Sequence, residues 1–135
     1  HERDSQGRFL EILQATPAKR RRAVVHCFSG SETELGRYLD LGFYIGITGI
    51  VTIAKRGRAL RNMLPSIPKD RLLIETDAPY LTPTPQRNRH RRNEPAFVRQ
   101  VLTKMAEVLE QDLPSLARQV WTNTCTLFRI DPSMG

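Results

Sequence analysis

The sequence predicts an α/β fold in which short parallel strands alternate with helices. Three apolar runs that end in Gly, Pro or polar residues are the expected strands: residues 23–28, 43–47 and 72–74. The third run is continuously apolar, as is typical of a parallel strand buried on both faces, and helical spacing fills the intervals between the runs. This alternation is typical of successive right-handed βαβ units.

The predicted helices before the second strand begin and end at residues with known effects on helix termini. Residues 5–14 carry an apolar stripe at helical spacing, and Pro17 ends that helix. Ser31 and Glu34 form a capping box at the start of the next helix, for which Gly42 is the expected C-terminal cap.

Three further helices are expected after the second strand. Residues 58–64 form a short one, and the apolar residues between 97 and 109 recur at the clearest helical period in the chain. Asn93 is the expected N-cap of that second helix. Residues 112–114 separate that helix from a last helix whose apolar face lies between residues 116 and 128, whereas residues 79–92 are rich in Pro and Arg and predict a loop.

Length and composition limit the protein to one modest core. The chain has 135 residues, of which 39% are hydrophobic and 26% charged. A closed eight-stranded barrel typically needs about 250 residues, so the sheet is either small and open or incomplete. No run approaches the roughly 18 apolar residues of a membrane span, and no signal-peptide pattern opens the chain, so we expect a cytoplasmic protein without a membrane partner. Cys27 and Cys125 lack a CxxC partner, which predicts reduced, structural thiols.

The charge of the chain favours polyanions as partners. The formal net charge is +7, and the excess is concentrated at residues 19–22 and 87–92. Basic clusters of this kind are typical of nucleic-acid-binding surfaces, although a solvated basic face has the same composition.

Two polar residues lie at the ends of otherwise apolar strands. His26 interrupts the first strand, and Asp77 follows the third; the carboxyl ends of parallel strands are where α/β proteins gather catalytic side chains. An imidazole nitrogen and a carboxylate oxygen suit a divalent metal, whereas a hydrogen-bonded core histidine and a turn-capping aspartate are the alternatives. Glu75 shares a strand face with Asp77, so it either orients a ligand from behind or pairs with a basic group.

Four motifs together resemble the TatD family of metal-dependent deoxyribonucleases. They are HERDS at 1–5, VVHCFSGS at 24–31, FYIGITG at 43–49, and LLIETDAPYLTP with RRNEPAFV between 72 and 98. In that family they correspond to the fifth, sixth, seventh and eighth strands of a metal-dependent hydrolase TIM (β/α)8 barrel. The resemblance therefore implies that residues 1–135 are a single partial domain, the C-terminal half of the barrel from the tip of strand five, whose missing partner is the N-terminal half.

The resemblance also implies roles for individual residues. His1, His26 and Asp77 match metal ligands of the family, whereas its His-x-His pair and its Glu ligand have no counterpart in this sequence. Two divalent ions (Mg, Mn or Zn) are implied, with Asp77 binding one and accepting the proton of the attacking water, and with His1 and His26 holding the other. Glu75 is expected to orient one of these metal ligands from behind. Arg89, Arg91 and Arg92 are the expected contacts to substrate phosphates, although Arg92 and Asn93 equally suit a structural role in the loop.

The implied activity is divalent-metal-dependent hydrolysis of phosphodiester bonds in single-stranded DNA or RNA. Because the segment carries only part of the site, we expect it to be inactive alone. Two alternatives remain open: a metal-dependent hydrolase that cleaves a non-nucleic ester or amide, and a non-catalytic basic fragment that binds nucleic acid.

Overall fold

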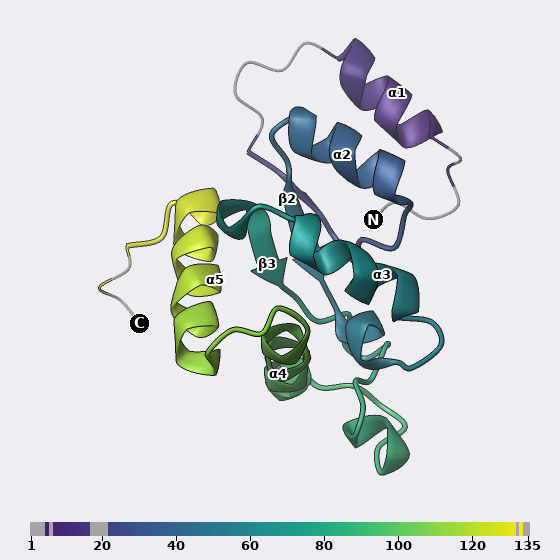
Figure 1. Cartoon of the computed structure of the whole chain (residues 1–135), viewed down its shortest axis with the longest axis vertical. Helices are drawn as coiled ribbons and strands as arrows, with labels where there is room; N and C mark the ends of the chain where they lie inside the picture. Colours follow the sequence, from purple (N-terminus) through teal and green to yellow (C-terminus); the bar gives the residue numbers. More distant parts are fainter. Residues whose placement is uncertain (1–4, 6, 17–21, 132, 134–135) are drawn as a thin grey trace.

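The structure is a computed structural model that describes residues 5, 7–16, 22–131 and 133. Its centre is a parallel three-stranded sheet with the order β1-β2-β3, formed by β1 (Val24–Val25), β2 (Tyr44–Ile47) and β3 (Leu72–Ile74) (Figure 1). The helices are α1 (Arg8–Ala15), α2 (Glu32–Asp40), α3 (Arg58–Met63), α4 (Val98–Val108) and α5 (Leu113–Phe128). Short 3-10 turns cover Gly49–Thr52, Leu64–Ser66, Lys69–Arg71, Gln86–Asn88 and Pro95–Phe97. The predicted alternation of strands and helices is confirmed.

The strands pair so that their carboxyl ends lie at one edge of the sheet. Val24 is opposite Tyr44, and Ile45 is opposite Leu72, both in parallel register. The first strand is shorter than predicted, because the backbone of Cys27 adopts a positive φ of 54° that an extended strand cannot contain. The first strand therefore ends at Val25, and the chain leaves the carboxyl edge of the sheet at His26.

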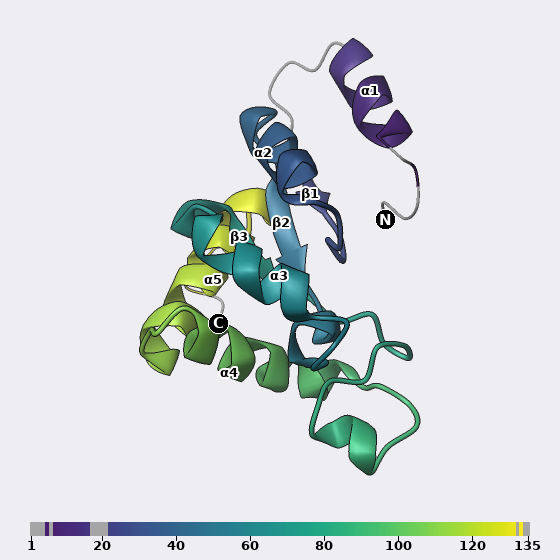
Figure 2. The ribbon, with the colours of Figure 1, turned by 45° about the vertical axis from the view of Figure 1, so that its right-hand side comes forward.

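The two faces of the sheet carry different side chains. Ile45, Ile47 and Leu72 belong to the large core, which also contains buried residues of all five helices. Tyr44 and Leu73 point to the other face and form a small cluster with Leu127 of α5. Because strand side chains alternate, Gly46 and Glu75 lie on this second face. Figure 2 shows α1 and α2 toward the upper end of the sheet and α4 below it.

The helix termini confirm some predicted caps and correct others. Ser31 and Glu34 form the predicted capping box at the start of α2. Gly42 follows the C-cap Leu41 with a φ of 79°, and its N–H donates to the carbonyl of Leu39, so it ends the helix as expected. The last helix begins at Leu113, inside the segment 112–114 that the sequence predicts to precede it, because Asp112 accepts a hydrogen bond from the N–H of Ser115 and serves as its N-cap.

The prediction that Asn93 caps the helix after the loop is wrong. A 3-10 turn, Pro95–Phe97, precedes α4, so Asn93 lies too far from the helix to bond its first N–H groups. Instead, the buried side chain donates through Nδ2 to the carbonyl of Tyr80 at 2.7 Å and accepts through Oδ1 from the N–H of Glu94. Asn93 therefore fixes the loop that follows β3, which is the structural role the sequence left open.

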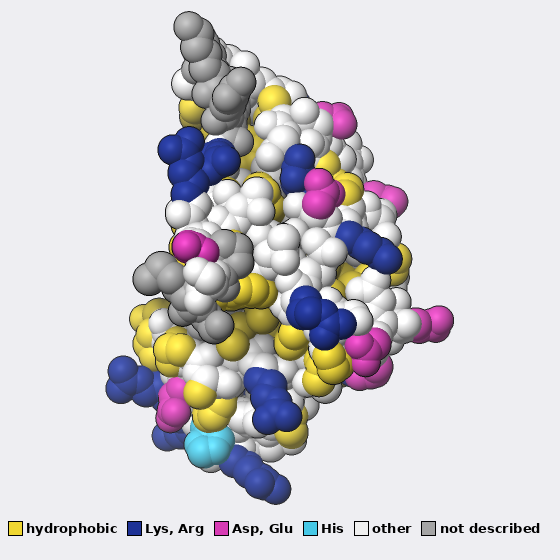
Figure 3. Space-filling view, turned by 90° about the vertical axis from the view of Figure 1, so that its left-hand side faces the viewer, with side chains coloured by type: hydrophobic (Ala, Val, Ile, Leu, Met, Phe, Trp, Pro, Cys, Tyr) yellow, Lys and Arg dark blue, Asp and Glu magenta, His cyan; other side chains and the backbone are white. Residues whose placement is uncertain are grey.

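Both cysteines are free and buried within the described part of the chain, which agrees with the predicted structural role. None of the helices in the described residues is long and apolar enough to cross a bilayer. Large apolar side chains are nevertheless exposed on α5, at Trp121 and Phe128. Figure 3 shows apolar side chains at the surface of the molecule on the side that it draws.

Asn123 joins α5 to the start of β3. Its side chain is 3% exposed; Nδ2 donates to the carbonyls of Lys69 and Leu72, at 2.7 and 2.8 Å, and Oδ1 accepts from Gln119. We expect Asn123→Ala to lower the free energy of unfolding by about 1–3 kcal/mol, because it leaves the buried Leu72 carbonyl without its donor. Urea denaturation measures the change. Thr126→Ala, which removes an exposed bond within the same helix, is the control, and an equal effect of the two substitutions would contradict this role.

Candidate active site

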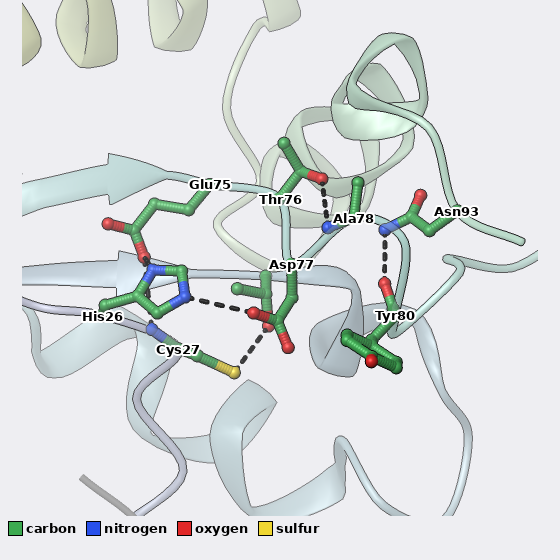
Figure 4. A network of polar contacts seen from close by, with 9 residues as sticks. His26, Cys27, Glu75, Thr76, Asp77, Ala78, Tyr80 and Asn93 are labelled. Atoms are coloured by element: carbon green, nitrogen blue, oxygen red, sulfur yellow. Dashed lines mark hydrogen bonds and ion pairs between the residues drawn. The ribbon is translucent and has the colours of Figure 1, made fainter. Parts of the chain in front are cut away.

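His26 lies at the edge of the sheet where the strands end. It follows β1 directly, and the chain stays attached to β2 through the N–H of Phe28, which donates to the carbonyl of Gly46 at 3.1 Å. The imidazole contacts two carboxylates: Nδ1 is 2.8 Å from Oε2 of Glu75, and Nε2 is 3.3 Å from Oδ1 of Asp77 (Figure 4). The structure thus brings together the three residues that the sequence singled out at this edge.

Glu75 reaches His26 across the central strand. Its N–H donates to the carbonyl of Ile47, which extends the pairing of β3 with β2 by one residue, and its Oε2 also accepts from the N–H of Cys27 at 3.2 Å. The carboxylate lies over Gly46, where any added Cβ would overlap it. Gly46 is therefore the residue that leaves room for a carboxylate to cross from β3 to the end of β1.

Asp77 is held in a tight, well-bonded turn. Its carbonyl accepts from the N–H of Tyr80 at 2.7 Å, and Oγ1 of Thr76 accepts from the N–H of Ala78 at 3.0 Å. The following segment packs directly on the turn after β2, because Gly49 has no Cβ that would overlap the carbonyl of Leu81. Thr76 accordingly bonds its own turn rather than acting as a nucleophile.

The environment of Cys27 makes its thiol unreactive. Burial raises the pKa of the Cys27 thiol; the charges of Asp77 and Glu75 act in the same direction, while the bond to Thr48 and the charge of Arg56 act against it. The sulfur lies 3.3 Å from Oγ1 of Thr48. A thiol with a raised pKa stays protonated at neutral pH, so Cys27 is a packing residue and not a nucleophile.

A histidine between two carboxylates is stable in two ways. A doubly protonated ring donates to both Glu75 and Asp77. Alternatively, Nδ1–H donates to Glu75 and leaves the lone pair of Nε2 directed toward Asp77, where a cation shared by nitrogen and oxygen removes the repulsion. Two ligands of one ion, each about 2.0–2.2 Å from it, lie roughly 3 Å apart, and Nε2 and Oδ1 are separated by 3.3 Å. The pair would therefore suit one divalent ion as two of its ligands.

The other predicted site residues fall into two groups. His1 lies outside the described residues, and among the described ones no group of three His, Cys, Asp or Glu side chains is arranged to hold a metal. Arg89, Arg91 and Arg92 are exposed on the loop after β3 and do not contact His26 or Asp77 in the described hydrogen-bond network. Figure 3 shows several Lys and Arg side chains at the lower end of the molecule, where Figure 1 draws this loop.

Three residues at this edge were not singled out by the sequence. Arg56 and Tyr80 line a pocket with Arg91, and Gly46 makes room for Glu75. Of the three, only Gly46 could have been identified from the sequence, since a glycine inside an apolar strand indicates a bulge or the close approach of another group. Arg56 and Tyr80 have no periodic or spacing signal, because loops from different strands bring them together.

A parallel α/β sheet with an imidazole and two carboxylates at its carboxyl edge has the layout of a metal-dependent α/β hydrolase. The comparisons identify the family. The family model described as "TatD related DNase" matches residues 1–129, and the chain belongs to that family.

Relatives and solved structures agree with this assignment. The chain is 47% identical over 133 residues to the 3'-5' ssDNA/RNA exonuclease TatD of Klebsiella pneumoniae, covering 97% of this chain and 51% of that protein. Identity to the TatD exonuclease of Pantoea ananatis is also 47%, covering 95% of this chain and 50% of that one. YJJV, a TatD homologue from Escherichia coli K12, superposes with a TM-score of 0.79 at 27% identity, over 96% of this chain and 48% of that chain. The chain thus spans about half the length of the curated relatives it matches.

Gly46 provides a test of how Glu75 holds the site. In Gly46→Ala the Glu75 side chain must move away, so we expect His26 to lose its Nδ1 partner and the free energy of unfolding to fall by about 1–3 kcal/mol. Urea denaturation and the ¹⁵N resonances of the His26 ring measure the two effects.

Gly36, in the middle of α2, is the matched control, since an added Cβ there meets open space. Gly36→Ala should stabilise the protein by about 0.5–1 kcal/mol and leave His26 unchanged. Unchanged His26 resonances in Gly46→Ala would show that Glu75 does not need this gap.

Proposed function

We propose that the chain is the C-terminal half of a metal-dependent hydrolase TIM barrel, with residues 1–135 forming a single partial domain. Three parallel strands in the order β1-β2-β3 support this, as does coverage of about half of each curated relative. In this interpretation β1, β2 and β3 are the sixth, seventh and eighth barrel strands. The face that carries Gly46 and Glu75 would then look into the barrel, toward the N-terminal half.

We further propose that the intact protein hydrolyses phosphodiester bonds of single-stranded DNA or RNA. The observation that carries the proposal is the placement of His26 between Glu75 and Asp77 at the carboxyl edge of the sheet. Membership of the TatD-related DNase family and the printed names of the relatives, which describe exonucleases acting on single-stranded DNA and RNA, support the substrate class.

Each residue of the site has a different proposed role. Divalent metal ions would be bound by His26, by Asp77 and by His1, which lies outside the described residues. We propose two such ions, of Mg, Mn or Zn. A bound divalent ion supplies a water of lowered pKa and neutralises charge on the phosphate. Asp77 accepts the proton of the attacking water, and Glu75 holds the His26 ring so that Nε2 faces the reaction.

The loop after β3 supplies positive charge at the same end of the sheet. Arg89, Arg91 and Arg92 are exposed there, and guanidinium groups bind phosphate oxygens in a forked geometry. We propose that these residues contact the backbone of the nucleic acid. The two buried, free cysteines support a reducing compartment, and we retain the cytoplasm as the proposed location.

One observation favours a second candidate. The formal net charge of +7 favours electrostatic binding, which agrees with a non-catalytic basic fragment that only binds nucleic acid. Metal dependence separates the two functions, because electrostatic binding alone persists in chelator whereas cleavage does not.

The test is a gel assay of single-stranded DNA cleavage by the intact protein, with and without chelator. We expect Asp77→Asn to lower the cleavage rate by about 10²–10⁴-fold, because it removes the proton acceptor and the charge that binds metal. Binding of the strand should change little. Asp70→Asn is the control, since Asp70 is exposed and pairs with Arg71 at the opposite end of β3.

Charge reversal in the loop after β3 should instead weaken binding of the strand. Arg91→Glu/Arg92→Glu is expected to weaken binding and to reduce the salt dependence of the binding constant by about one unit of slope for each phosphate that is no longer bound. Cleavage that persists in chelator, or full activity in Asp77→Asn, would overturn the metal mechanism. Cleavage of small esters without cleavage of DNA or RNA would indicate the non-nucleic hydrolase.

A further inference from the structure

A pocket of about 440 Å³ lies beside the Asp77 turn. Loops that follow two neighbouring strands line it: Arg56 comes from the segment after β2, and Tyr80, Arg87, His90 and Arg91 come from the segment after β3. Its volume falls within the range of pockets that bind small ligands, which is about 300–1,000 Å³. Among the described residues, His26, Glu75 and Asp77 do not line this pocket, so it lies beside the proposed cleavage site rather than within it.

Tyr80 presents an aromatic ring in this pocket. Its side chain is 71% exposed, the highest value among the exposed large hydrophobic residues of the described chain. Its backbone is fixed, because its N–H donates to the carbonyl of Asp77 and its carbonyl accepts from Nδ2 of Asn93 at 2.7 Å. In Figure 4 the ring of Tyr80 and the carboxylate of Asp77 lie on the same side of the turn that joins them. An exposed aromatic ring on a fixed backbone is a feature that proteins use to stack an unpaired base.

The pocket is also strongly basic. Arg56, Arg87 and Arg91 line it, and the described lining includes neither Asp nor Glu. None of these three guanidinium groups forms an ion pair with another described residue. They are therefore available to an anion that enters the pocket, and three arginines around one aromatic ring match a nucleotide better than they match a free phosphate.

The loops that carry these residues are held in place before any ligand binds. Arg61 donates to the carbonyls of Val51, Ile53 and Ala54 and so fixes the segment that leads to Arg56. On the other side, the ring of His90 lies 5.2 Å from that of Phe97. The backbone of these loops therefore needs little ordering on binding, which favours affinity.

We propose that this pocket binds one nucleotide of a single strand, with the base stacked on Tyr80 and the adjoining phosphates held by Arg56, Arg87 and Arg91. The inference rests on the proposed nuclease function, for which it names the group that positions the strand. Because Tyr80 closes the turn that begins at Asp77, a nucleotide stacked there places a neighbouring phosphodiester beside His26 and Asp77.

The test compares a labelled single-stranded oligonucleotide with an abasic strand of the same length. Binding to the intact protein is measured by fluorescence anisotropy in chelator, so that neither metal nor cleavage is needed. Wild type should bind the oligonucleotide more tightly than the abasic strand. Tyr80→Ala should weaken binding of the oligonucleotide by about 5- to 100-fold and leave the abasic strand unaffected, whereas Tyr80→Phe should behave as wild type.

The arginines should act on both strands equally. Arg56→Gln is expected to weaken binding of the normal and the abasic strand by the same factor and to lower the salt slope by about one unit. Phe128→Ala and Arg118→Gln are the matched controls, because Phe128 is a large side chain that is 60% exposed and Arg118 is exposed, and both lie on α5 outside the pocket.

Several outcomes would overturn the pocket as a nucleotide site. They are the absence of any binding to wild type, an equal loss of both strands in Tyr80→Ala, and an equal effect of Phe128→Ala. Inorganic phosphate that competes equally well with wild type and Tyr80→Ala, without a preference for bases, would reduce the pocket to an anion site. Binding that depends on Tyr80 in a protein that cleaves nothing would support the pocket and overturn the nuclease. Metal-dependent cleavage with an unchanged KM in Tyr80→Ala would support the nuclease and overturn the pocket.

Discussion

The carboxylate of Glu75 connects all three strands at the carboxyl edge of the sheet. Its backbone N–H pairs with β2, its side chain crosses β2 above Gly46, and its Oε2 accepts from the backbone of Cys27 and contacts His26 just beyond β1. The side chain is only 16% exposed, so its charge is costly unless these partners are present. The interaction therefore fixes the rotation of the imidazole and requires the register that places Gly46 opposite Leu73. The register of β2 and β3 and the orientation of the His26 ring therefore depend on the same contact.

The surrounding loops divide into a fixed inner part and an exposed outer part. Gly49 lets the segment after Asp77 pack on the turn after β2, Oγ1 of Thr52 accepts from the N–H of Thr84, and Asn93 bonds Tyr80 from the far end of the loop. These contacts are mostly buried, whereas the arginines between residues 87 and 92 point to solvent. A rigid base with charged side chains extending from it would suit the proposed single-stranded ligand, because the base would set the position of the strand and the arginines would adapt to it.

The sequence predicted those features that depend on local pattern. Apolar runs predicted the three strands, and the period of two placed Glu75 and Asp77 on one face, so the convergence of His26 and Asp77 followed from parallel pairing. Features that depend on the neighbouring strand were missed. The positive φ of Cys27 shortens β1, the crossing of Glu75 requires Gly46, and the bond of Asn93 to Tyr80 joins residues 13 positions apart. Asn93 resembled an N-cap because the side chains that cap helices also anchor loops, and the intervening Pro95 turn decided between the two roles.

Electrostatics explain why the carboxylates and the arginines occur at one edge. Two carboxylates at the end of the sheet repel a phosphodiester: at an effective dielectric constant of 20, two like charges 4 Å apart cost about 4 kcal/mol. One imidazole shared by Glu75 and Asp77 offsets at most one of these charges. A polyanion can therefore approach Asp77 only if further positive charge is supplied, either by a cation between Nε2 and Oδ1 or by the guanidinium groups around Tyr80. The two sources would act at different distances, since in the proposed function the arginines attract and hold the strand, whereas only a charge in contact with Asp77 neutralises the phosphate at the point of attack. In the proposed nuclease, a site with both would bind the single strand without metal and cleave it only with metal.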